Sequence, residues 1–334
     1  MKQIMALMGR FLKKLIVFSL CLGNVLANNE SPPLFQEDKV AKIVEKKPSI
    51  VVGDVVVEWF SSKISMDLRQ ASIFQILGYH SDNIYNLLEP NRWFVGSCEI
   101  VKNNGANGLD REWKGDIPEN INADIFIPAS VVDGDAEYLS VLLHRIIPLA
   151  IYEVIHKEIE KERGKPHADL VKLKWANDVL VNGKKICGIK PDDFGTNDKV
   201  VSYQFGINVN MSEKDLAKID QPATSLSVEC GKHIDPDRIL REIVLEIVKL
   251  MQRYKENLND LDNDFSSKMA FLGEEVVVYD YVPGKNIEGV LEGVSGGRLY
   301  LRNPQTGQTF CILPGYGLLR SKKLMEEAKF KNRE

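Results

Sequence analysis

The sequence predicts an α+β protein that consists of a large domain of mixed strands and helices followed by a small all-β module. Three observations lead to this prediction. From residue 50 onward, β-prone runs alternate with amphipathic helical segments. Short strands separated by turn residues then fill residues 275–313. Finally, a length of 334 residues leaves room for two or three domains.

The overall composition excludes several classes of protein. The chain is 44% hydrophobic and 27% charged, so it is not collagen-like, of low complexity or a multi-span membrane protein. Its formal net charge of −4 offers no bulk attraction for nucleic acid, and no nucleic-acid partner is expected. The five cysteines and five histidines form no CxxC, HExxH or Cys/His cluster. Neither a disulfide framework nor a metal site made by a protein cluster is therefore predicted.

The first 29 residues carry four basic residues and no acidic residue. An apolar run at residues 15–26 follows the basic residues and ends beside Ala27. This pattern is typical of a cleavable secretory-type signal, and the run is short for a membrane span, which needs about 20 apolar residues. A single anchor, an amphipathic mitochondrial presequence and a mis-assigned start remain open.

We therefore expect a signal-like targeting segment at residues 1–27 and a linker or transit segment at residues 28–49. The destination would be a plastid-type organelle, a mitochondrion or the endomembrane system, and otherwise the cytoplasm; no stable membrane partner is expected. Removal of residues 1–27 takes away four basic and no acidic residues, so 39 basic against 47 acidic residues give a net charge of −8. The remaining protein is clearly acidic.

The large domain is expected at residues 50–268, and β-prone runs predict several strands in it. Residues 50–60 are β-rich, residues 171–189 form a strand pair, and residues 200–210 form another strand.

The helices of this domain follow from apolar spacing and capping residues. Residues 138–162 form one kinked helix or two helices, because Pro148 interrupts the helical pattern. Asp235 and Pro236 form an N-cap and first-turn pair that opens an amphipathic helix. Residues 257–267 are predicted to be a polar break. The apolar side of the amphipathic helix consists of Leu240, Val244, Ile247, Val248 and Met251.

The small module is expected at residues 269–322, before a charged tail at residues 323–334. PG, SGG, NPQTG and GYG turns separate its short strands, as in a small β-barrel. The strands are predicted at residues 275–281, 287–294, 298–302 and 309–313.

The segment at residues 172–190 is the most informative part of the sequence for function. Asn182 and Gly183 lie between two β-prone runs and favour a hairpin with a type I′ turn. A two-residue loop pairs Val181 with Lys184, Leu180 with Lys185 and Asp178 with Cys187.

Alternation along this hairpin gathers charge on one face. Lys174, Asp178 and Leu180 share that face, and Lys185 joins them from the partner strand, diagonal to Asp178. Two ammonium groups beside one carboxylate suit an anionic substrate, and Gly188 would let a ligand approach the backbone. A solvated strand face with an Asp–Lys ion pair explains the same spacing, so spacing alone leaves both interpretations open.

The residue string itself is more specific. KWANDVLVNGKKICGI at residues 174–189 is similar to the K-W-P-N-D…G-K-K-I-x-G-I signature of the biotin–protein ligases (biotin–[carboxylase] ligases and holocarboxylase synthetases). The resemblance extends in the right order over about residues 55–320. Its other parts are Trp113 with the strand at 120–128, GINVN at 206–210, ATSL at 223–226 and an SH3-like module at 272–320.

The resemblance implies a mixed β-sheet catalytic domain with packed helices, followed by an SH3-like β-barrel. It also implies a reaction in which biotin, the substrate, condenses with ATP, with Mg²⁺ as cofactor, to biotinyl-5′-AMP. Biotin then passes to a lysine of the biotin carboxyl carrier domain of a carboxylase, such as acetyl-CoA carboxylase. Some members of the family form homodimers, and no feature of this sequence decides the oligomeric state.

Residue roles are carried over from the family motifs residue by residue. For the family's early S-T-N biotin-binding motif, from which this sequence departs, the nearest match is the stretch Ile64–Asp67. The implied catalytic residues are Lys185 and Asp178. The implied biotin-binding residues are Ser65, Asp67, Lys185 and Gly188. The implied ATP- or adenylate-binding residues are Gly105, Arg111, Trp113, Lys174, Asn177 and Asn208.

The chain departs from the family pattern in its glycine- and arginine-rich adenylate loop. Residues 105–113 keep Gly105, Arg111 and Trp113, but Ala106 and Gly108 stand where arginines are expected. The loss of positive charge leaves open a weak or inactive homologue that binds biotin or nucleotide without turnover. A lipoate or octanoate ligase of the same superfamily is the other alternative.

Overall fold

A computed structural model of the chain describes residues 43–64, 91–100, 106–108, 111–113, 119–191, 199–219, 221–282, 285–313 and 318–325. The chain divides into two compact units, Met1–Ala41 and Lys42–Glu334, and every described residue belongs to the second. The signal-like segment lies outside the described residues.

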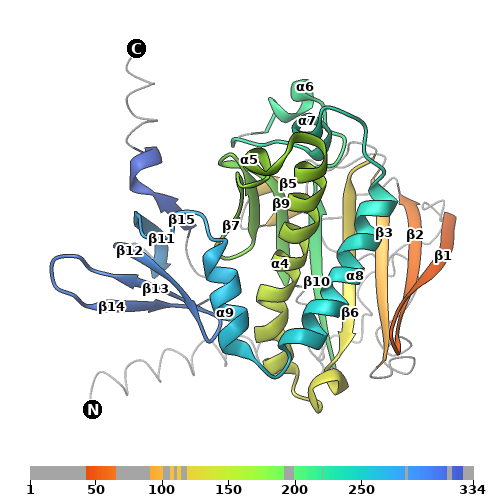
Figure 1. The fold of residues 1–334 in the computed structure, drawn as a ribbon, viewed down its shortest axis with the longest axis horizontal. Helices are drawn as coiled ribbons and strands as arrows, with labels where there is room; N and C mark the ends of the chain where they lie inside the picture. Colours follow the sequence, from red (N-terminus) through yellow and green to blue (C-terminus); the bar gives the residue numbers. More distant parts are fainter. Residues whose placement is uncertain are drawn as a thin grey trace, which may run out of the picture. The chain divides into compact units, whose positions relative to one another are not determined.

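Eight of the described strands form one large sheet in the order β1-β2-β3-β6-β10-β9-β8-β7 (Figure 1). The strands β2 and β3 run parallel, whereas the other neighbours are antiparallel. The sheet is therefore mixed, as the family resemblance implied. Its strands are β1 (Ile43–Val52), β2 (Val55–Ile64), β3 (Arg92–Ile100), β6 (Ile121–Pro128), β10 (Val200–Ile207), β9 (Lys184–Pro191), β8 (Asp178–Val181) and β7 (Val171–Lys174).

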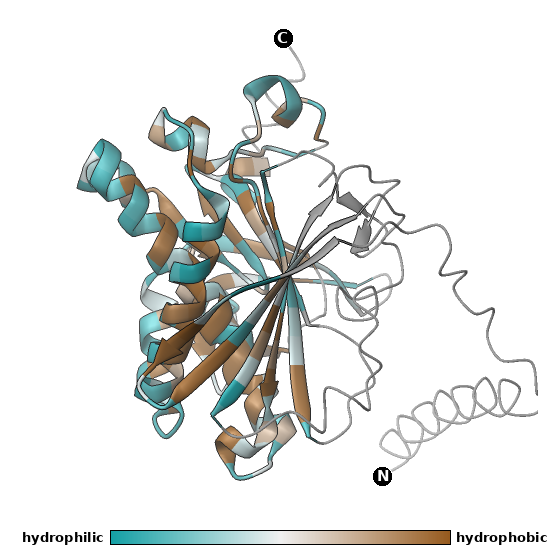
Figure 2. Cartoon of the chain, turned by 90° about the vertical axis from the view of Figure 1, so that its right-hand side faces the viewer, coloured by the Kyte–Doolittle hydropathy of each residue, from teal (hydrophilic) through white to brown (hydrophobic). Residues whose placement is uncertain are grey.

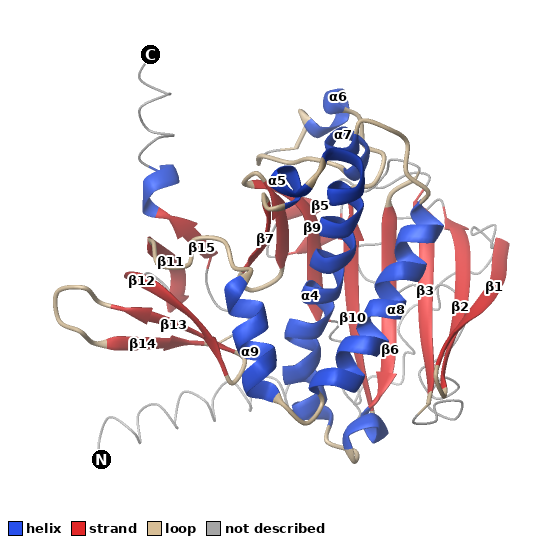
Figure 3. Cartoon of the chain, viewed as in Figure 1, coloured by secondary structure: helices blue, strands red, loops and turns tan. Residues whose placement is uncertain are grey.

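Helices pack on one face of this sheet (Figures 2 and 3). The longest is α4 (Ala136–Arg163), whose N-cap Asp135 accepts a hydrogen bond from the Tyr138 amide. Pro148 lies inside α4, so residues 138–162 belong to a single helix. Among the described helices, α4 is also long and apolar enough to cross a membrane, and 78% of its most apolar window is buried in the protein. The helix α4 is thus packed as a core helix of the large domain.

The predicted start of the amphipathic helix is confirmed. The helix α8 (Pro236–Tyr254) has Asp235 as its N-cap and Pro236 in its first turn. All five residues predicted for its apolar side are buried. Together, α4 and α8 cover the sheet residues that alternate inward, and the core lies between these two layers.

Two predictions about the strands differ from the structure. The strand β1 begins at Ile43, inside the expected linker, because a bulge places Pro48 and Ser49 opposite Glu58 and so admits a proline into an edge strand. Residues 171–189 contain three strands, β7, β8 and most of β9, instead of two.

The predicted polar break at residues 257–267 is wrong, because these residues form the helix α9 (Leu258–Ser267). Asn257 caps α9 by accepting a hydrogen bond from the Asp260 amide. Leu261 and Phe265, four residues apart, bury one narrow side of the helix. Two apolar anchors in a largely polar segment produce a weak helical period in the sequence.

A second sheet follows α9, in agreement with the predicted β module. Its described strands are ordered β14-β13-β12-β11-β15. The fifth strand was not predicted, since it has only four residues and comes directly after the PGYG stretch of the sequence. The strands are β11 (Glu275–Val282), β12 (Lys285–Ser295), β13 (Arg298–Arg302), β14 (Thr309–Ile312) and β15 (Leu318–Ser321).

The two sheets are joined by hydrogen bonds of the connecting segment. The Leu173 amide of β7 donates to the Lys268 carbonyl at 2.9 Å, and the Ala270 amide donates to the Leu173 carbonyl at 2.7 Å. The connection between the sheets is thereby attached to the same strand that carries Lys174.

Candidate active site

The hairpin of β8 and β9 has the predicted turn and a bulge that the sequence did not reveal. Asn182 and Gly183 have φ values of 49° and 73°, as a type I′ turn requires. Val181 pairs with Lys184 and Leu180 with Lys185, as predicted.

The predicted pairing of Asp178 with Cys187 is wrong, because Asp178 lies opposite Gly188. The extra residue in β9 is Ile186. Both Ile186 and Cys187 are fully buried, although neighbours on a regular strand point to opposite faces. A bulge lets both side chains enter the core.

The charged face predicted for this hairpin is present. The Nζ atom of Lys185 lies 2.6 Å from Oδ1 of Asp178, and that of Lys174 lies 3.1 Å from Oδ2. These side chains are only 12–19% exposed. We call Lys174, Asp178 and Lys185 the charged cluster; it brings together three of the residues predicted for the site.

The charged cluster carries one positive charge in excess, and this determines how its groups titrate. Burial by itself would raise the pKa of Asp178, but Lys185 and Lys174 outweigh it and hold that pKa below its ordinary value. Burial lowers the pKa of Lys174, and the attraction of Asp178 offsets this only in part. Arg320, on β15 of the second sheet, lowers the pKa of Lys174 further and thus adds positive charge that sequence reasoning missed.

Two glycines lie beside the charged cluster. Asp178 pairs with Gly188 across β8 and β9, and Gly188 pairs with Gly206 across β9 and β10. Residues paired in this way share a face of the sheet, so main chain alone forms the floor next to the carboxylate. Gly206 was not singled out as a site residue, although its place in the GINVN motif was the available signal.

The predicted nucleotide-side asparagines make main-chain contacts. The side-chain Nδ2 of Asn177 donates to the Ile189 carbonyl at 2.7 Å. The buried Asn208 donates through Nδ2 to the Thr224 carbonyl at 3.0 Å. Both side chains therefore fix the loops that border the charged cluster.

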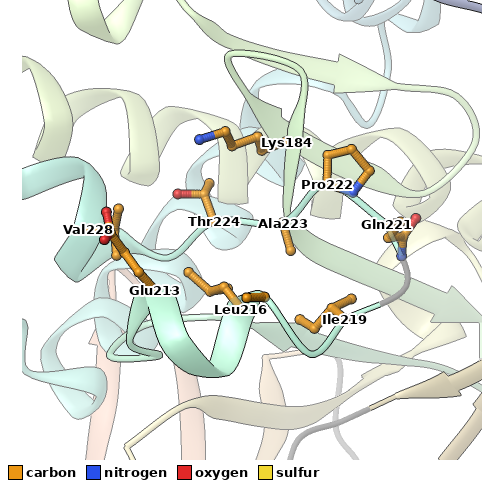
Figure 4. A pocket seen from close by; sticks show the side chains of 10 residues that line it. Lys184, Glu213, Leu216, Ile219, Gln221, Pro222, Ala223, Thr224 and Val228 are labelled. Atoms are coloured by element: carbon orange, nitrogen blue, oxygen red, sulfur yellow. The ribbon is translucent and has the colours of Figure 1, made fainter. Parts of the chain in front are cut away.

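Residues 222–224 extend the sheet beside Lys185. The Lys185 amide donates to the Pro222 carbonyl at 2.9 Å, and the Thr224 amide donates to the Lys185 carbonyl at 3.0 Å. An open cavity of about 520 Å³ borders this segment (Figure 4). It is lined by α6 (Glu213–Leu216) and α7 (Leu226–Cys230), by the nearby apolar residues Ile219, Pro222 and Ala223, and by Lys184 and Thr224. Sequence reasoning did not predict this cavity.

Several predicted site residues are not placed. Ser65, Asp67 and Gly105 lie outside the described residues. Arg111 and Trp113 lie on β5 (Arg111–Trp113), which pairs with β4 (Ala106–Gly108) in a short two-stranded ribbon. Within the described part of the chain, no group of three or more His, Cys, Asp or Glu side chains could hold a metal ion.

Comparisons with known proteins agree with this geometry. Residues 120–210 match the biotin/lipoate A/B protein ligase family, a segment that contains the whole charged cluster and both glycines. The biotin–[acetyl-CoA-carboxylase] ligase of Paracoccus denitrificans is 28% identical over 138 residues, which is 40% of this chain and 57% of that protein. The bifunctional ligase/repressor BirA of Bacillus subtilis is 38% identical over 85 residues, 25% of this chain and 26% of that protein. The chain thus spans little more than half the length of the first of these relatives.

Solved structures show the same fold. The biotin protein ligase of Aquifex aeolicus, in complex with biotin and ATP, has a TM-score of 0.55 and 21% identity, covering 80% of this chain and 99% of that one. The biotin protein ligase of Leishmania major, in complex with biotin, has a TM-score of 0.51 and 17% identity, covering 78% and 99%. The chain therefore has the biotin protein ligase fold, and its residues 120–210 match the model of the biotin/lipoate A/B protein ligase family.

Proposed function

We propose that this protein is an ATP-dependent biotin–protein ligase that makes biotinyl-5′-AMP and transfers biotin to a lysine of a carboxylase carrier domain. The observation that carries the proposal is the charged cluster of Lys174, Asp178 and Lys185 beside a glycine floor. Its excess positive charge lies in the segment that matches the family. A partly buried cation cluster is a site for an anion, because the cations are poorly solvated until a ligand neutralises them.

The first half-reaction joins two anions. An oxygen of the biotin carboxylate forms a bond to the α-phosphorus of ATP, the bond from that phosphorus to the β-bridging oxygen breaks, and pyrophosphate leaves with the electron pair. Lys185 would offset the repulsion between carboxylate and phosphate and stabilise the charge that develops on the phosphoryl oxygens. Asp178 holds the ammonium groups of Lys185 and Lys174 in place at both of its oxygens.

The glycine floor supports binding of the apolar part of biotin. Gly188 and Gly206 have no side chains, so a ring system could lie directly against the strands next to Asp178. The cavity bordered by residues 222–224 is a candidate place for the nucleotide. The apolar residues Ile219 and Ala223 line it, and Ala223 is bridged to Lys185 through the main chain.

The chain's own carboxylate in the charged cluster is a poor ligand for Mg²⁺. Both oxygens of Asp178 are taken by lysines, so phosphate oxygens of ATP would supply most ligands to the ion, as is common for Mg²⁺. When bound, Mg²⁺ would neutralise the leaving pyrophosphate.

In the second half-reaction the amine of the carrier lysine attacks the carbonyl carbon of biotinyl-5′-AMP. An amide bond forms, the bond from the carbonyl carbon to the phosphate oxygen breaks, the amine proton is lost and AMP leaves. Lys185 would stabilise the departing phosphate.

We further propose that residues 1–27 are a targeting segment that precedes a catalytic domain and an SH3-like domain.

The full-length protein tests the proposal with biotin, MgATP and a biotin carrier domain. We expect biotin-dependent exchange of pyrophosphate into ATP and a carrier that streptavidin detects. Exchange that depends on lipoate or octanoate, with none for biotin, would contradict the choice of substrate.

A binding protein without turnover is the second candidate. It is favoured by Ala106 and Gly108 on β4, where the family has arginines that contact the adenylate. Saturable biotin binding with neither pyrophosphate exchange nor carrier labelling would support this candidate over the ligase.

A further inference from the structure

A buried carboxylate is linked to the charged cluster through Thr224 and takes no part in the proposed chemistry. Glu229, on α7, is 8% exposed. Its Oε1 accepts a hydrogen bond from the Thr224 hydroxyl at 2.5 Å, and its Oε2 lies 3.0 Å from Nε2 of His167. Both oxygens are thus engaged, one by the segment beside Lys185 and one by a half-exposed histidine on α5 (Lys165–Ala168).

Helix capping does not account for Glu229. Ser225 already caps α7, since its hydroxyl accepts a hydrogen bond from the Val228 amide. A buried carboxylate is costly unless hydrogen bonds compensate it, so its placement requires the partners that it has.

Thr224 connects this carboxylate to two residues of the site. Its amide donates to the Lys185 carbonyl and its carbonyl accepts from Asn208. Regular pairing of β9 with β10 ends where Cys187 faces Ile207, so residues 222–224 supply the main-chain partners of Lys185 on that side. A shift of Thr224 would therefore displace the backbone from which the Lys185 side chain extends.

We propose that Glu229 is a positioning residue of the active site, which acts through Thr224 on Lys185 and Asn208 and is itself oriented by His167. The inference rests on the proposed function for its effect on catalysis, but the contact can be tested without activity. A hydrogen bond from a hydroxyl to a carboxylate is stronger than one between neutral groups, which suits a link that must hold a loop in one register.

Hydrogen exchange of the full-length protein measures the contact directly. Glu229→Ala removes both hydrogen bonds, and we expect the amides of Lys185 and Thr224 to exchange about tenfold faster or more, as expected when a hydrogen bond of this strength is lost. Glu229→Gln keeps an acceptor for Thr224 and should retain most of the protection. The matched control is Glu158→Ala, because Glu158 is also a buried carboxylate but pairs with Arg238 on the helix layer.

Kinetics of biotin-dependent pyrophosphate exchange measure the consequence. For Glu229→Ala we expect kcat to fall about 10- to 100-fold, since small displacements of a catalytic group have effects of this size. The KM values for biotin and ATP should change less, and Glu229→Gln should restore most of kcat. Thr224→Val combined with Glu229→Ala should be no slower than the slower single variant, because both remove the same link.

The outcomes separate this inference from the proposed function. Unchanged exchange of the Lys185 and Thr224 amides in Glu229→Ala would overturn the positioning role whatever the activity. Faster exchange with wild-type kcat would overturn it as well. Wild-type protein without any biotin-dependent activity would overturn the ligase proposal, and the exchange rates would then decide the contact alone. A similar loss of kcat in Glu158→Ala would reduce the effect to general destabilisation and overturn the specific role.

Discussion

Two groups of buried charged side chains differ in charge balance, and the difference distinguishes a binding site from a structural ion pair. The charged cluster consists of two lysines and one aspartate that keep a small exposed fraction. The other group is the ion pair of Arg145 on α4 and Asp262 on α9, whose side chains are 0% and 5% exposed and lie 2.5 Å apart.

The two groups differ in charge balance. Arg145 and Asp262 neutralise each other, and the second oxygen of Asp262 accepts a hydrogen bond at 2.6 Å from the Gly296 amide, in the turn between β12 and β13. This pair joins the helix layer to the second sheet and leaves no charge for a ligand. The charged cluster has one cation too many, which is unfavourable for a support and useful for binding an anion. The comparison predicts that changes to the pair reduce stability, whereas changes to the cluster reduce activity.

The largest expected effect is a loss of stability when the Arg145–Asp262 ion pair is broken. Asp262→Ala leaves the fully buried Arg145 without its counter-ion and removes the acceptor of Gly296, which should cost about 3–5 kcal/mol in the free energy of unfolding. Urea unfolding followed by fluorescence measures this loss. The kcat of the molecules that remain folded should stay within about threefold of wild type, as for a contact outside the site. An unchanged unfolding midpoint would remove the distinction between support and site.

The second largest expected effect is a loss of activity when the charged cluster loses Lys185. Lys185→Ala should reduce biotin-dependent pyrophosphate exchange by about 100- to 1,000-fold, as for removal of one group that stabilises developing charge. The fold should survive, because Asp178 keeps Lys174 as a partner. Lys249→Ala is the control, since Lys249 is an exposed lysine of α8 that pairs with Glu246. Wild-type exchange in Lys185→Ala would sink the assignment of the site.

The parts that the sequence predicted well share local causes. The turn at Asn182 and Gly183, the cap at Asp235 and the alternation that collects Lys174, Asp178 and Lys185 each depend on residues close in the chain. Such features follow from backbone preferences that a single sequence displays.

The parts that it missed depend on tertiary contacts. The bulge at Ile186 arises because the core accepts two successive side chains, and α9 exists because Leu261 and Phe265 find a buried surface. Arg320 and Glu229 lie about 135 and 45 residues from Lys185 in the chain. Only the fold brings Arg320 near Lys174 and links Glu229 to Thr224. No local pattern indicates such pairings.

A smaller effect concerns the pH dependence of stability. The pKa of Asp178 is lowered in the folded protein, so its contribution to stability is present above the pKa of the unfolded chain and is lost as pH falls through the folded value. We expect wild type to be more stable than Asp178→Asn by about 1–3 kcal/mol at pH 7, with the difference shrinking below about pH 4. Urea unfolding of both proteins between pH 7 and pH 3 measures it. A difference that is independent of pH would show that the carboxylate charge is not what holds the lysines.

The smallest effect crosses from the second sheet into the cluster. Arg320 makes Lys174 harder to protonate, so Arg320→Gln should raise the pKa of Lys174, which NMR of isotope-labelled lysine side chains follows. The same change removes a cation near an anionic substrate, and we expect the KM for MgATP to rise about two- to fivefold, with a weaker dependence on salt. Arg302→Gln is the control, because Arg302 lies exposed in the same sheet and pairs with Glu292. If both variants raise the KM for MgATP equally, the second sheet acts through its total charge. If only Arg320→Gln raises this KM, the second sheet contributes one particular charge to the site, and β15 then belongs in part to the site.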